Sequence, residues 1–169
     1  MQIRGRIVTI SASAATDYAD EVRARLGLDV AVVDTPREAV TGCDLIVTAG
    51  PILKEPHGTI QAGWMSRGAF ASLVDFDSYW HPEALKAVDK FCTDDRAQLQ
   101  YYQSIGYFRD IPPVYADLGE LVIRSKPGRE RETERTVAAN LGLALDDMAT
   151  ASLVYERAIE KGIGTWLPL

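Results

Sequence analysis

Residues 30–51 read VAVVDTPREAVTGCDLIVTAGP, and this stretch decides the expected fold. Two apolar runs rich in β-branched residues, 30–33 and 45–49, flank a short helix expected over 36–40, with proline at its start. Each run is apolar along its whole length, which is typical of strands in a parallel sheet covered on both faces. The stretch therefore predicts a strand-helix-strand unit of the α/β class.

The same alternation continues on both sides of this unit. Further strands are expected at residues 7–10, 69–74, 87–92 and 135–138. Helices are expected before Gly27, over residues 82–86 and over residues 116–123. The aromatic-rich stretch 98–115 has no clear period, and we expect it to serve packing and not base stacking.

A long C-terminal helix is expected, with Asn140 as its N-cap and Gly162 as its stop. One stripe of this helix carries Leu141, Leu145, Met148, Ser152, Tyr155 and Ile159. Such a stripe needs a partner surface. Packing on its own sheet and docking to another subunit, including a dimer contact, both satisfy that need.

Composition excludes several classes of protein. The 169 residues are 47% hydrophobic and carry a formal net charge of -6, as expected of one globular domain and not of a nucleic-acid binder. No apolar run approaches the roughly 20 residues of a membrane span, and no signal peptide is recognisable, so we expect a cytoplasmic protein. Cys43 and Cys92 are expected to be reduced thiols. His57 and His81 are isolated, so no metal site is expected.

A parallel sheet binds ligands at the carboxyl ends of its strands, which here are followed by residues 11–13, 48–51, 74–78 and 93–95. A dinucleotide site normally shows a strand, a GxGxxG turn and a helix. The chain contains no such motif, and the turn expected after the first strand reads SASAAT, residues 11–16, without glycine or carboxylate. Taken alone, these residues do not favour independent dinucleotide binding.

Three segments carry a resemblance to a known family: residues 39–51 (AVTGCDLIVTAGP), residues 68–85 (GAFASLVDFDSYWHPEAL) and residues 127–169, with a PGR turn, a short strand, a G-x-A-x-x-D helix and a GIG ending. Together they resemble the ornithine cyclodeaminase and mu-crystallin family, over nearly the whole chain from Gly5 onward. The segments VDFDSYW and GIGTWLPL are most similar to a bacterial branch labelled as a tyramine oxidase subunit, and that label does not establish an activity.

The resemblance implies a Rossmann-like parallel sheet with flanking helices, lacking the first strand and its glycine-rich turn, plus the long C-terminal helix. We expect a truncated NAD(P)-binding domain over residues 1–139 and a packing or dimer helix over residues 140–169. The chain is then either a fragment of a longer protein with an N-terminal domain or a reduced relative. Because the first strand is central in such a sheet, its neighbours are expected to have unpaired edges.

The resemblance also implies chemistry. Family members move hydride between NAD or NADP and the α-carbon of a small amino or imino acid, in cyclodeaminases with loss of ammonia. Asp77 aligns with the catalytic aspartate, a general acid or base whose pKa burial can raise. Without the resemblance, the favoured interpretation of Asp77 is an exposed loop carboxylate or a cap for the helix over residues 82–86. Asp75 stands where the family has glycine, which puts the substrate in doubt.

Cofactor contacts are implied at three of the expected strand ends, by Ser11, Ala12, Ser13, Thr48, Ala49, Gly50 and Val74. The choice between NAD and NADP cannot be read from Ser11 and Ala12. Lys126 and Arg129 either meet an anion or form a solvated turn. Two alternatives to an enzyme stay open: a catalytically inactive, mu-crystallin-like accessory subunit, and a parallel-sheet domain for another ligand. The expected partners are a small amino-acid substrate and either a second copy or a missing N-terminal domain.

Overall fold

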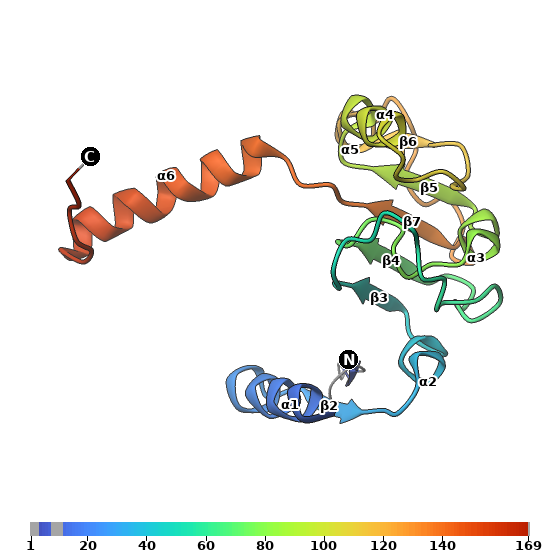
Figure 1. Cartoon of the computed structure of the whole chain (residues 1–169), viewed down its shortest axis with the longest axis horizontal. Helices are drawn as coiled ribbons and strands as arrows, with labels where there is room; N and C mark the ends of the chain where they lie inside the picture. The colour runs from blue at the N-terminus through green and yellow to red at the C-terminus, as the bar shows by residue number, and fades with distance from the viewer. Residues whose placement is uncertain (1–3, 8–11, 169) are drawn as a thin grey trace.

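The computed structural model describes residues 4–7 and 12–168. Two parallel sheets are present among them. The smaller pairs β1 (Arg4–Ile7) with β2 (Asp29–Val32), and the larger has the strand order β3-β4-β7-β5-β6. Its strands are β3 (Leu45–Thr48), β4 (Phe70–Leu73), β5 (Lys90–Thr93), β6 (Ala116–Asp117) and β7 (Thr136–Ala139). All strand pairs are parallel, which confirms the expected α/β class (Figure 1).

The N-terminal unit is built around helix α1 (Ala12–Leu26), which connects β1 to β2. Ala15 and Ala19 are buried, and Arg23 Nε donates to the carbonyl of Val30 at 3.1 Å, so the helix is fastened to β2. Of the strand expected over residues 7–10, only Ile7 lies among the described residues, where it ends β1.

The core of the larger sheet lies around β4, β7 and β5. The side chains of Leu73, Phe91 and Val137 are fully or almost fully buried, and all four residues of β5 are buried. Burial on both faces explains why these strands are apolar without alternation. The expected strand over residues 87–92 is shifted, because the backbone N–H of Asp89 donates to Arg135 and pairing begins at Lys90.

Short helices cover the sheet: α2 (Pro36–Val40), α3 (Pro82–Lys86), α4 (Arg96–Ser104) and α5 (Leu118–Val122). The first two begin and end as expected. Helix α4 was not expected in the aromatic stretch. Asp95 caps it by accepting from the N–H of Gln98 at 2.6 Å, and Leu99 is buried beneath it. Likewise, the helix expected over residues 116–123 starts later, because residues 116–117 form β6 and Asp117 caps α5.

The expectation that Asn140 caps the last helix was wrong. Helix α6 (Ala144–Lys161) begins after Leu143, which makes no side-chain cap hydrogen bond. The Asn140 side chain instead donates to Ser72 Oγ at 2.8 Å, and the Asp94 carboxylate binds the N–H groups of Leu141 and Gly142 at 2.7 and 2.8 Å. These contacts keep the chain extended past β7. Gly162 ends α6 in the left-handed conformation, as expected.

Helix α6 extends away from the sheet (Figure 1), and none of its residues is buried. Packing on its own sheet is therefore excluded as the partner surface for its apolar stripe. Among the described residues β1 pairs only with β2 and β3 pairs only with β4, so both strands have an open edge, as do β2 and β6 at the other sides of the two sheets. Leu45 and Val47 on β3 are 73% and 67% exposed, so one face of β3 is not covered by the described residues. None of the helices described here is long and apolar enough to span a membrane.

Candidate active site

The carboxyl ends of β3, β4, β7 and β5 lie along one edge of the larger sheet, where a parallel sheet places its ligand sites. Thr48 ends β3, and residues 74–78 follow β4 in a tight turn in which Ser78 N–H donates to the Asp75 carbonyl at 3.3 Å. The two strand ends are joined directly, because Val74 N–H donates to the Thr48 carbonyl at 2.9 Å.

Asp75 fixes the turn after β3. Its carboxylate is fully buried, accepts from Thr48 Oγ1 at 2.6 Å and accepts from the Gly50 N–H at 3.0 Å. The Thr48 hydroxyl in turn accepts from Trp80 Nε1 at 3.3 Å. A charge buried in this way is stable only because hydrogen bonds satisfy it. The aspartate at a position where glycine was expected is therefore a structural clamp on residues 48–50.

Phe76 separates the two aspartates and adopts φ 62, a left-handed conformation that a bulky residue rarely takes. An aromatic cluster holds it there: its ring lies 4.8 Å from the ring of Tyr102, 5.5 Å from Tyr107 and 4.8 Å from Phe108. In this conformation both Asp75 and Asp77 are buried. Such strain persists only where surrounding packing enforces it, and it gathers at functional sites.

Asp77 is 4% exposed, and among the described residues its Oδ1 atom has no hydrogen-bond partner. Burial raises the pKa of this carboxyl above its usual value, with smaller contributions from the charges of Asp110 and Asp75, against the lowering effect of the backbone N–H groups of Asp77 and Phe108. Asp77 is thus neither an exposed loop carboxylate nor a helix cap. The cap of α3 is His81, whose Nδ1 accepts from Glu83 N–H at 3.3 Å.

Some of the expected cofactor residues already make contacts within the chain, and others do not. Ser11 lies outside the described residues, and Ala12 and Ser13 open α1. The Thr48 hydroxyl and the Gly50 N–H are already used by Asp75. The Tyr79 ring covers Gly50 so closely that a Cβ there would lie 2.5 Å from it. Only Ala49 and the half-exposed Val74 remain open at this edge.

These residues fit the nicotinamide ring of a dinucleotide but not its pyrophosphate. Val74 and Ala49 give a small apolar surface at the edge that also carries the buried Asp77 carboxyl, and such a surface suits a flat nicotinamide ring. A pyrophosphate needs glycine N–H groups at a helix N-terminus, and the 169 residues contain no GxGxxG turn. Two pockets among the described residues, of about 490 and 320 Å³, are lined by other residues and not by Thr48 or Asp77.

Sequence reasoning missed the Asp75 clamp and the Asp94 contact that sets the path into α6. The sequence does place polar residues just after β4 and β5, but it does not show in which direction their side chains point. The anion-binding interpretation of residues 126–129 fits poorly. Arg129 donates to the Gly68 carbonyl and to Thr136 Oγ1, and Lys126 lies 5.6 Å from the centre of the Tyr115 ring.

Parallel strands, covering helices and a buried carboxylate at the carboxyl edge define a Rossmann-like α/β protein. The sequence matches the ornithine cyclodeaminase/mu-crystallin family over residues 3–162, and the chain belongs to this family. This confirms the resemblance drawn from residues 39–51, 68–85 and 127–169.

Proteins of similar sequence include the Δ1-pyrroline-2-carboxylate reductase of Bacillus cereus, which is 31% identical over 87% of this chain and 47% of its own length. The alanine dehydrogenase of Archaeoglobus fulgidus is 30% identical over 77% of this chain and 42% of its own length. The Δ1-pyrroline-2-carboxylate reductase of Thermococcus litoralis, solved with NADH and L-proline, superposes with a TM-score of 0.79 at 26% identity, over 97% of this chain and 53% of that one. The chain spans about half the length of these relatives.

Proposed function

We propose that this chain forms the cofactor- and substrate-facing half of an NAD(P)-dependent enzyme that moves hydride to or from the α-carbon of a small amino or imino acid. The observation that carries the proposal is the Asp77 carboxyl, buried at the carboxyl edge with an unpartnered Oδ1. A buried carboxyl with a raised pKa at the ligand edge is what an acid–base step at a substrate nitrogen requires.

The division of labour follows from the contacts. Asp77 is the catalytic acid and base: burial raises the pKa of its carboxyl, which favours the protonated form that donates to a substrate nitrogen. Asp75 holds residues 48–50 in place through Thr48 and Gly50, and Ala49 and Val74 form the apolar contact surface. A bound nicotinamide supplies or accepts the hydride.

The open edges of β1 and β3 support a second part of the proposal. A strand followed by a glycine-rich turn, from residues outside this chain, fills the space between these edges and cradles the pyrophosphate. The apolar stripe of α6, with Leu145, Met148 and Ile159 more than half exposed, docks on the same missing portion or on a second copy. In this proposal residues 1–139 carry the candidate active site, and residues 140–169 form a separate unit that contacts the rest of the protein or a second copy.

NADH titration tests the proposal. Trp80 reports on the site because its Nε1 donates to Thr48, and a Trp166→Phe background removes the exposed C-terminal indole. We expect saturable quenching by NADH. Where NADH binds and the chain reduces NAD with proline, alanine or ornithine, the Asp77→Asn variant should lose that turnover while binding persists. Equal turnover in the variant would remove Asp77 from its role.

One observation favours a second function, a catalytically inactive accessory subunit. The Thr48 hydroxyl and the Gly50 N–H, two groups at the expected cofactor turn, are occupied by Asp75. If NADH gives no quenching at about 1 mM, an affinity weaker than most cofactor sites, this accessory function is the better account of the chain.

A further inference from the structure

A pocket of about 490 Å³ opens at the opposite, amino edge of the sheet, lined by Arg67, Asp89, Arg131, Thr133 and Arg135. Its residues come from the turns that lead into three neighbouring strands, β4, β5 and β7, in the centre of the sheet. Asp89 directly precedes β5 and Arg135 directly precedes β7, so rigid elements position both of them.

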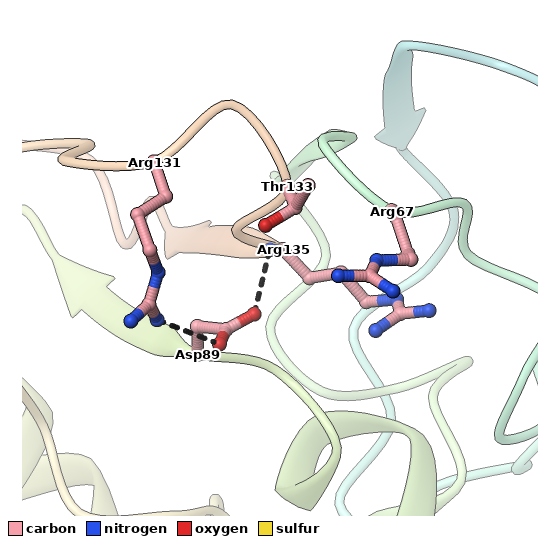
Figure 2. Close-up of a pocket in the computed structure, with 5 residues that line it drawn as sticks. All are labelled: Arg67, Asp89, Arg131, Thr133 and Arg135. Carbon is pink, nitrogen blue, oxygen red and sulfur yellow. Dashed lines mark hydrogen bonds and ion pairs between the residues drawn. The ribbon is translucent and has the colours of Figure 1, made fainter.

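Hydrogen bonds hold the floor of this pocket in place. Asp89 Oδ2 accepts from the Arg135 N–H at 2.9 Å, and Arg135 Nε donates to the Met65 carbonyl at 2.9 Å. Arg131 Nη2 lies 3.6 Å from Asp89 Oδ1 and 3.4 Å from Glu134, so two carboxylates compensate its charge. Figure 2 shows Arg131 and Asp89 together on one side of the pocket.

The other side of the pocket has no such compensation. Arg67 and Arg135 both line the same pocket, and Figure 2 shows their guanidinium groups on the side away from Arg131. Within residues 4–7 and 12–168, Arg67 has no ion pair or hydrogen bond, and Arg135 uses only its Nε. Two cations that line one pocket repel each other, and an anion bound in that pocket relieves the repulsion. Guanidinium groups bind oxyanions through paired N–H donors.

We infer that this pocket binds a phosphate monoester with a polar organic part. Two uncompensated guanidinium groups match the two charges of a phosphate, and the Thr133 hydroxyl offers a further donor. The volume falls in the range of small-molecule sites and exceeds that of one phosphate group. All five lining side chains are polar or charged, so a hydroxyl-rich remainder fits better than an aromatic one. The site is independent of the proposed hydride chemistry at the other edge.

Calorimetric titration of the full chain with inorganic phosphate and with glycerol 3-phosphate, at constant ionic strength set with sodium chloride, tests the inference. We expect saturable binding with one ligand per chain. Arg67→Gln should weaken it about tenfold, the effect of losing one charge-assisted pair. Because Arg67 is exposed and makes no hydrogen bond or ion pair among the described residues, the variant should fold normally, as circular dichroism can verify.

Arg157→Gln on the exposed face of α6 is the matched control and should leave binding unchanged. Arg67→Lys keeps the charge but not the paired donors, so its affinity for phosphate should lie between those of the unaltered chain and Arg67→Gln. The inference is overturned if phosphate shows no saturable binding at about 10 mM, or if Arg67→Gln binds as tightly as the unaltered chain. Equal or tighter binding of malonate would also overturn it, since the pocket would then be a carboxylate site.

Discussion

Replacing Asp75 with alanine breaks the clamp that organises the candidate site. The substitution removes two hydrogen bonds to a fully buried carboxylate, from Thr48 Oγ1 at 2.6 Å and from the Gly50 N–H at 3.0 Å. Hydrogen bonds to a charged group contribute about 1.5–3 kcal/mol each, so the pair contributes about 3 kcal/mol at the low end of that range. Relief of the desolvated charge offsets part of this, which leaves a net loss of about 2 kcal/mol.

Urea unfolding of the full chain measures this loss as a lower midpoint at unchanged slope. Asp75→Asn keeps an acceptor for Thr48 but loses the charge, and should cost about half as much, or about 1 kcal/mol. Asp17→Ala is the control, because this exposed aspartate lies on α1, away from the site. A loss below about 0.5 kcal/mol for Asp75→Ala, the range of ordinary surface substitutions, would refute the clamp.

Three further predictions follow from other contacts. The pKa of Asp77 is raised from 3.8, so the folded chain binds more protons than the unfolded chain between pH 3.8 and the raised value, and stability falls as pH rises through that window. Asp77→Asn should therefore gain in melting temperature over the unaltered chain above pH 3.8 and show no such gain below it; a pH-independent difference would contradict this. The hydrogen bond from Arg96 lowers the pKa of Glu120, so Arg96→Gln should raise that pKa in a carbon-detected NMR titration, and an unchanged value would show that the pair is not formed in solution. Deleting residues 144–169 should leave the urea midpoint unchanged, because no residue of α6 is buried; a lower midpoint would reveal a contact with the sheet.

Local sequence signals predicted much of the fold. Proline at the start of α2 and α3, together with apolar runs at β3 and β4, placed these elements to within a residue or two. Helix α4 was missed because its aromatic residues mask the period, and its start depends on the Asp95 cap. Asn140 has a good N-cap side chain, yet a tertiary contact with Ser72 takes that side chain, which local reasoning cannot anticipate.

The candidate site was predictable only in part. Position after a strand and family resemblance pointed to Asp77, and the structure buries that side chain at the expected edge. The use of Thr48 and Gly50 by Asp75 depends on the direction of a side chain in a left-handed turn at Phe76, a conformation that no residue type there signals. The pocket lined by Arg67 and Arg135 is formed by turns that are far apart in the sequence, so it could be recognised only once the order of strands in the sheet was known.

The titration of the Asp77 carboxyl, followed by carbon-detected NMR with and without NADH, tests the central claim most directly. We predict a midpoint above 3.8 in the free chain, because the carboxyl is buried, and a change of that midpoint when NADH is added. A midpoint at or below 3.8 that NADH leaves unmoved would place Asp77 outside any cofactor site and contradict the account.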